Sequence, residues 1–166
     1  ILCGLCGVLV LYFYNFSSGF LYEIHMLLHG KFDDEFGTYR VFLWKRTIML
    51  IKDYPLLGSG PDTFAIRFMA RFTDDIIKIG PLTINDTAAN VYLTMIINIG
   101  IVGLTSYLTF IIYQIKEGTL RINKYSCILL VAIVCFLIQD FFNLWVVIVT
   151  PIFWLLMAIH YISLNE

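Results

Sequence analysis

Long apolar stretches constrain the fold of this chain more than any other feature. A helix needs about 20 mostly apolar residues to cross a bilayer, and four stretches reach or approach that length: 1–22, 90–114, 125–140 and 146–163. The polar segment 23–89 separates the first two and holds eight of the eleven Lys and Arg residues and nine of the twelve Asp and Glu residues. We therefore predict a single all-α integral membrane domain. It has about four transmembrane helices, the first truncated, and one long loop.

The composition supports a membrane protein and excludes several other classes. Hydrophobic residues make up 60% of the chain and charged residues 14%, which is too little polar surface for a soluble domain of this size. The basic residues form no stripe, so nucleic acid is not an expected partner. Residue 1 is Ile within an apolar run, which indicates a fragment of a longer protein. Cys3 and Cys6 lack a second ligand pair and are interpreted as small hydrophobic residues.

The short connection 115–124 predicts the orientation of the helices. Its Lys116, Arg121 and Lys124 outweigh Glu117, and short basic loops stay in the cytoplasm. The segment 23–89 would then lie outside, because loops longer than about 60 residues escape this charge rule.

The polar segment contains a predicted amphipathic helix from Thr38 to Tyr54. At about 100° per residue, Trp44, Ile48 and Ile51 share one face. The opposite, polar face holds Lys45, Arg46, Lys52 and Asp53. Arg40 projects with this apolar set, so it either extends toward the helix end, stacks on Trp44 or binds an anion. The turn that starts at Pro55 lacks the Lys-Ser/Thr of a phosphate loop, so no nucleotide is expected.

His25 and His29 have the spacing of metal ligands on one helical face. A catalytic zinc needs a third ligand, and Asp33, Asp34 and Glu35 are only nearby in the sequence. We interpret the histidines as interfacial residues, and we expect neither a metal nor a cofactor.

Two motifs together carry a resemblance to a known family. The stretch FGTYRVFLWKRTIMLIKDYPLLGSGPDTF resembles the external loop of bacterial O-antigen ligases and related polysaccharide polymerases. The matching positions are Arg40, Trp44, Pro55, Leu56, Gly58, Gly60 and Phe64. The ligases also carry His-Asn, nine residues and Gly-x-x-Gly at the next membrane helix. This chain has Ala89-Asn90, nine residues, then Gly100 and Gly103, so the spacing fits and the histidine is missing. Glycines one turn apart also suit close helix packing, whatever the function.

The resemblance implies a surface-polysaccharide enzyme of the bacterial cytoplasmic (inner) membrane, of which this chain is the latter part. Such proteins transfer a glycan from undecaprenyl pyrophosphate to an acceptor hydroxyl on the outer side, without a metal. The implied partners are a lipid-linked oligosaccharide, a glycan acceptor and membrane lipids. Arginine suits the pyrophosphate, because its planar fork binds phosphate oxygens bidentately. Arg40 is the first candidate for this role, followed by Arg67 and Arg71, whose alternative role is contact with headgroups or water.

The missing histidine leaves the group that assists the acceptor hydroxyl open. Asp86 is the nearest replacement for a base at Ala89, although it also suits an ordinary loop position. This favours a polymerase over a ligase and keeps an inactive relative possible. The rival function is a transporter or a non-catalytic scaffold. Transport is disfavoured because it would need charged residues inside the membrane, and the predicted spans contain almost none beyond Asp140, which lies at a span boundary.

Overall fold

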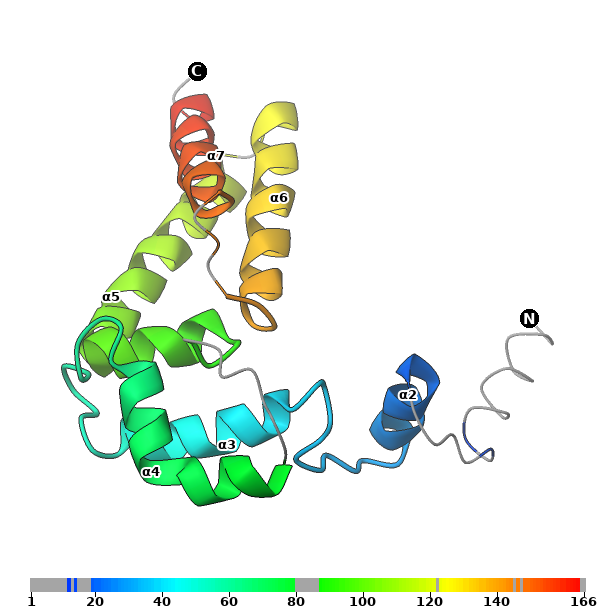
Figure 1. The fold of residues 1–166 in the computed structure, drawn as a ribbon. Coiled ribbons are helices and arrows are strands. Elements are labelled where there is room, and N and C mark those ends of the chain that lie inside the picture. The colour runs from blue at the N-terminus through cyan, green and yellow to red at the C-terminus, as the bar shows by residue number, and fades with distance from the viewer. Residues whose placement is uncertain are drawn as a thin grey trace. The chain divides into compact units, whose positions relative to one another are not determined.

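Helices are the only regular elements in the part of the chain that the structure describes (Figure 1). The computed structural model describes residues 12, 14, 19–79, 87–121, 123–144, 146 and 148–164. These residues form α2 (Phe20–Leu28), α3 (Arg40–Ile51), α4 (Phe64–Ile79), α5 (Val91–Leu120), α6 (Lys124–Asp140) and α7 (Thr150–Ser163). The predicted all-α class is confirmed for this part of the chain. The chain divides into two compact units, 1–45 and 46–166, with the boundary inside α3.

Among the described helices, only α5 is both long and apolar enough to cross a membrane. It has 30 residues and continues beyond the predicted end of its span at 114. The helices α6 and α7 are apolar but shorter, with 17 and 14 residues. The four predicted spans therefore stay a prediction, and residues 1–11 of the first lie outside the described residues.

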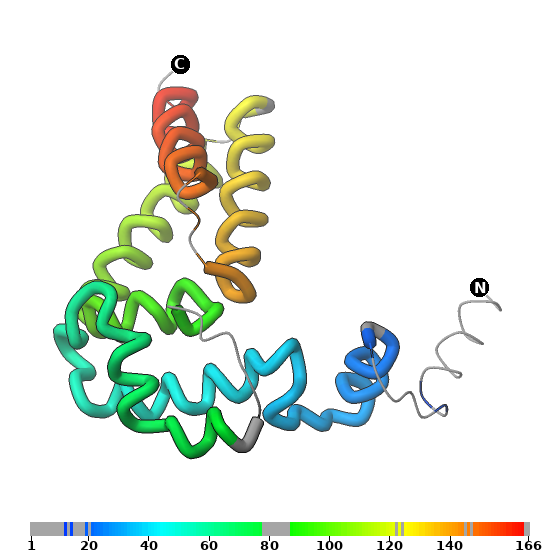
Figure 2. The backbone as a smooth tube through the Cα atoms, in the orientation of Figure 1, coloured from blue at the N-terminus to red at the C-terminus, as the bar shows by residue number. Residues whose placement is uncertain are grey.

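The helix α5 is interrupted at Gly100. This residue has φ 70° and ψ −176°, which is not a helical conformation. The tube in Figure 2 shows α5 changing direction partway along its length. At 1.5 Å per residue, the part after the break, 101–120, is about 30 Å long. That length alone matches the hydrocarbon thickness of a bilayer.

The second part of α5 packs with α6 and α7 around one apolar core (Figure 1). Ile111, Ile133 and Phe153 are almost fully buried there, and the rings of Phe136 and Phe153 stack with centroids 4.5 Å apart. Contacts of this kind between facing helices exclude voids and supply the dispersion energy that holds helices together in lipid.

A polar contact lies inside the same helix bundle. Ser126 and His160 are fully buried, and Ser126 Oγ lies 3.2 Å from His160 Nε2. A Cβ atom on Gly118 would lie only 2.5 Å from His160 Cε1 and Nε2. The absent side chain at Gly118 therefore makes room for the imidazole ring against α5, as small residues do between membrane helices.

The polar segment contains a second helix that the sequence analysis did not predict. In α4, Phe64, Phe68 and Phe72 recur at every fourth residue and are all buried. Consecutive rings lie 5.2 and 5.3 Å apart. This i, i+4 aromatic pattern is typical of a helix. The glycines and the proline that precede it indicated a turn, so the helix was not predicted.

The predicted helix in the same segment is shorter than expected. The helix α3 begins at Arg40, because Thr38 and Tyr39 before it have left-handed φ values of 57° and 64°. It ends at Ile51, before the turn at Pro55, as expected for the residues preceding a proline.

The predicted apolar face of α3 is not its most buried face, since Trp44 and Ile51 on it are only half-buried. Ile48 is 51% exposed, whereas Phe42, Thr47 and Leu50 are buried on the opposite side. Arg46 contributes to this outcome, because its Nε lies 3.4 Å from the Asp75 carboxylate on α4. The ion pair neutralises a charge that the sequence pattern had assigned to a solvated face.

Candidate functional site

The turn 55–60 fills the break in α5. Non-helical backbone leaves amide and carbonyl groups without helical partners, and such groups must be paired when they lie within a membrane protein. Here the turn donates two hydrogen bonds to α5 and accepts two from it. They join Ser59 N to Ile97 O (2.7 Å), Gly60 N to Asn98 O (3.1 Å), Ile101 N to Pro55 O (2.9 Å) and Val102 N to Leu56 O (3.2 Å). We call this set of contacts the junction.

Two motif glycines make the junction possible. Gly58 has φ +71°, and a Cβ atom there would lie 2.6 Å from Ile97 O and from the backbone of Asn98. Gly100 has φ +70°, and its Cβ atom would lie directly on the Leu56 carbonyl group. Both positions need a left-handed conformation, and neither leaves room for a Cβ atom between the two backbones. Gly103 differs, because its Cβ atom would meet the side chain of Ile99 in its own helix.

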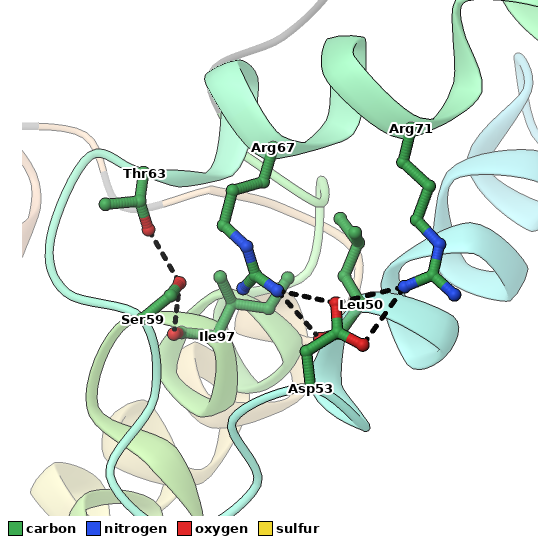
Figure 3. A network of polar contacts seen from close by, with 7 residues as sticks. All are labelled: Leu50, Asp53, Ser59, Thr63, Arg67, Arg71 and Ile97. Carbon is green, nitrogen blue, oxygen red and sulfur yellow. Dashed lines mark hydrogen bonds and ion pairs between the residues drawn. The ribbon is translucent and has the colours of Figure 1, made fainter.

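Side chains extend the junction toward α4. Ser59 Oγ lies 3.1 Å from Ile97 O and 2.6 Å from Thr63 Oγ1 (Figure 3). Thr63 directly precedes the first residue of α4 and also donates to Gly60 O at 2.9 Å. The break in α5 and the start of α4 therefore belong to one hydrogen-bonded network.

Two arginines of α4 converge on one carboxylate (Figure 3). Arg67 Nη2 donates to Asp53 Oδ2 at 2.8 Å, and Arg71 Nη1 lies 3.1 and 3.0 Å from Asp53 Oδ1 and Oδ2. Arg67 also lies 4.8 Å from the centre of the Tyr54 ring and 3.4 Å from Leu50 O at the end of α3. We call Asp53, Arg67 and Arg71 the arginine cluster.

The arginine cluster carries more positive than negative charge and is accessible to solvent. Two guanidinium groups share a single carboxylate, so one positive charge is left over. The Arg71 side chain is 48% exposed and the Asp53 side chain 41%, whereas Arg67 is 19% exposed. Such a site can bind an anion with several oxygen atoms. The alternative is an ion pair that only connects α3 to α4, and exposed pairs contribute little stability.

Arg40 lies in the other unit, at the start of α3. Its Nη1 donates to Gly37 O at 3.4 Å, and its buried Nε has no hydrogen-bond partner within the described residues. Trp44 lies one turn later and is partly buried. The left-handed residues before Arg40 cost of order 1–3 kcal/mol each, a kind of strain that concentrates at functional sites.

The structure places Ala89 at the start of α5, and Asp86 lies outside the described residues. Ala89 is 7% exposed and has φ 49°. This left-handed region is several-fold enriched in Asn, Asp and His, and Ala is less suited to it. Asn90 follows as the N-cap of α5, with its Oδ1 accepting from Leu93 N at 3.0 Å.

A cavity of about 230 Å³ lies beside the start of α5. Thr87, Thr94, Asn98 and Pro61 are among the residues that line its mostly apolar wall. Asn98 Oδ1 is buried without a hydrogen-bond partner in the described part of the chain.

The predicted histidine pair is formed, but the described residues contain no group of three metal ligands. His29 Nδ1 lies 2.8 Å from His25 O, and the two rings lie 4.2 Å apart. The role of Asp53 was not predicted from the sequence, where it shares a helical face with Lys45, Arg46 and Lys52. Asp53 lies 14 and 18 residues before its arginine partners, and no local spacing connects residues so far apart.

Comparison with known protein families gives a match. The family described as O-Antigen ligase matches residues 1–108, well over half of the 166 residues. The matched part includes the junction and the arginine cluster. No curated protein and no solved structure matches the chain.

Proposed function

Because this chain belongs to the O-antigen ligase family, whose members are membrane proteins, we propose that it transfers a lipid-linked glycan to an acceptor hydroxyl. The donor in this proposal is undecaprenyl pyrophosphate, and the reaction takes place on the outer side of the cytoplasmic membrane. The observation that carries the proposal is the convergence of Arg67 and Arg71 beside the junction. It gives a phosphate-binding chemistry to the segment that resembles the family's external loop.

The chemistry requires a site for the leaving group. The acceptor oxygen attacks the anomeric carbon of the glycan, the bond from that carbon to the diphosphate breaks, and the hydroxyl proton is lost. The lipid diphosphate leaves with additional negative charge. Fixed guanidinium groups stabilise this charge as it develops, and two neighbouring forks, on Arg67 and Arg71, can contact oxygens of both phosphates.

Three further features belong to the same proposal. Residues 23–89 lie outside, 115–124 lie in the cytoplasm, and the four apolar stretches span the membrane. Arg40 is a further candidate for binding an anion of the donor, supported by its buried Nε, which has no hydrogen-bond partner among the described residues. The chain acts as a polymerase rather than a ligase, because Ala89 cannot serve as a base.

The first test is polymer production in a strain that lacks the gene, with the full-length protein supplied in trans. We expect Arg67→Ala and Arg71→Ala to lower polymer about 10- to 100-fold, the effect of losing one charge-assisted hydrogen bond. Arg67→Lys keeps the charge but loses the fork of the guanidinium group, so polymer production should fall in this variant too.

Arg46→Lys provides the matched control, because Arg46 also connects α3 to α4 but pairs with Asp75. It should retain near-native activity. Full polymer production by Arg67→Ala and by Arg71→Ala, at native protein level, would exclude both residues from donor binding.

The second test concerns Ala89→His. If the chain were a ligase disabled at one position, the restored base would raise transfer by about 10² to 10⁴. We expect instead that the native protein is active and that Ala89→His gains less than about threefold, because another group assists the acceptor. The left-handed backbone at Ala89 accepts histidine, so the substitution is a fair one. An inactive native protein, present in the membrane, would favour the non-catalytic scaffold.

A further inference from the structure

Asp53 occupies the position between two guanidinium groups that an anionic ligand would take. Both of its oxygens lie within 3.1 Å of Arg71 Nη1, and Oδ2 also accepts from Arg67 Nη2. A phosphate group bridging two arginines would use the same donors. The carboxylate and an incoming phosphate therefore compete for the same N–H groups.

The arginines have supports other than Asp53. The Arg67 guanidinium lies over the Tyr54 ring at 4.8 Å and contacts the Leu50 carbonyl at the end of α3. A carbonyl in the last turn of a helix attracts a cation. Arg71 lies 5.8 Å from the centre of the Phe72 ring. Loss of the Asp53 charge would therefore leave both cations near their present positions.

We propose that Asp53 is a displaceable counter-anion that holds the arginine cluster ready and is exchanged for the diphosphate of the lipid donor. This inference rests on the proposed function and adds a residue that sets donor affinity and product release. The 41% exposure of the Asp53 side chain lets water stabilise the carboxylate once it is displaced. After transfer, Asp53 returns to the arginines and lowers the affinity for the lipid diphosphate product.

The two roles open to Asp53 predict opposite results. A displaceable anion weakens diphosphate binding, so its removal should tighten binding. A carboxylate that merely aligns the arginines strengthens binding, so its removal should weaken it. Asp53→Asn keeps the shape of the side chain and removes the charge, which makes it the decisive substitution.

The experiment is a calorimetric titration of the purified full-length protein with inorganic pyrophosphate, in nanodiscs of phosphatidylcholine. We expect Asp53→Asn to bind pyrophosphate about three- to tenfold more tightly than the native protein, the scale of one partly exposed ion pair. Inorganic phosphate should bind about tenfold more weakly than pyrophosphate to both forms, because it carries less negative charge and fewer oxygens to share between the two arginines. Equal binding of phosphate and pyrophosphate would overturn the diphosphate assignment.

Asp75→Asn controls for net charge. Asp75 also pairs with an arginine across α3 and α4, at 3.4 Å from Arg46 Nε. Its substitution should leave pyrophosphate binding unchanged. An equal gain in affinity in Asp75→Asn would show that the effect of Asp53→Asn comes only from the change in net charge. Unchanged or weaker binding by Asp53→Asn would overturn the proposal. If Asp53→Asn fails to fold, Asp53→Ser is measured instead, and failure of both would identify a structural residue.

The proposed function has its own readout in the same titration. Arg67→Ala and Arg71→Ala should lose pyrophosphate binding, and retained binding by both would reject the site itself. In glycan transfer, Asp53→Asn should lower KM and kcat together, because the lipid diphosphate product leaves more slowly. A fall in kcat with unchanged KM would contradict the exchange.

Discussion

The two parts of α5 show two ways in which a membrane helix accepts a neighbour. From Ile97 to Val102, around Gly100, the neighbour is backbone, because the turn 55–60 forms hydrogen bonds to α5 on both sides of the break. After Gly100, the neighbours are side chains from α6 and α7, which pack on the apolar surface around Ile111. Each part contains a glycine at the point of closest approach, Gly100 in the first and Gly118 in the second.

The difference lies in what each neighbour can do when space is lost. The Leu56 carbonyl at Gly100 is held by its hydrogen bond to Val102 N and has no freedom to turn away. The His160 ring at Gly118 can change its rotamer, at the cost of the Ser126 contact. A backbone contact should therefore be intolerant to substitution, and a side-chain contact should adjust.

The largest expected effect is that of Gly100→Ala. A Cβ atom at this position collides with the Leu56 carbonyl, and φ +70° is unfavourable for alanine. We expect a loss of at least about 3 kcal/mol of stability. It should be visible as a strongly reduced melting temperature in detergent and low levels in the membrane. Polymer production should be lost with it, since the turn then no longer holds the start of α4.

Gly30→Ala separates the collision from the backbone strain. Gly30 has φ +64°, and nothing lies within 4 Å of its Cβ position. Alanine there should cost only about 1 kcal/mol, the strain of the left-handed conformation. If Gly30→Ala and Gly100→Ala have equal effects, the junction contributes nothing beyond the conformation of one residue.

The sequence predicted some features of this comparison and not others. Gly100 and Gly103 predicted that another backbone approaches α5 closely. Their spacing is that of two packed helices, so it did not predict the break in the helical conformation at Gly100. The motif glycines Gly58 and Gly100 lie in contact although 42 positions separate them in the sequence. Hydrophobic periodicity predicts contacts only between residues a few turns apart, so it could not predict this one. Apolar composition was enough to predict helices in the regions of α5, α6 and α7, because each region is a long, nearly uncharged apolar stretch.

The candidate site shows the same limit. Residue chemistry identified Arg67 and Arg71 as cations suited to phosphate, and it could not identify Asp53 as their shared partner. On α3, Arg46 was assigned to a solvated face because its partner Asp75 lies on another helix. Long-range ion pairs depend on the packing of α3 and α4, which no pattern within either helix specifies.

Gly118→Ala should have a smaller effect than Gly100→Ala, and one that can be reversed. The added methyl group displaces the His160 ring, an overpacking cost of about 1–3 kcal/mol. The higher helix propensity of alanine offsets about 1 kcal/mol of this cost. We expect a modest fall in melting temperature and polymer production near the native level, because Gly118 lies in the part of α5 remote in sequence from the junction.

The double variant Gly118→Ala with His160→Ala completes the comparison. Without the imidazole ring, the next atom near the methyl group at 118 is Leu130 Cδ1 at 3.4 Å, close to ordinary contact. In the His160→Ala background, Gly118→Ala should therefore be neutral or stabilising by up to about 1 kcal/mol, so the sign of its effect changes. Leu56→Ala cannot rescue Gly100→Ala in this way, because the colliding atoms there belong to the backbone. Rescue of Gly100→Ala by Leu56→Ala would contradict this difference between the two parts of α5. Failure of His160→Ala to rescue Gly118→Ala would contradict it as well.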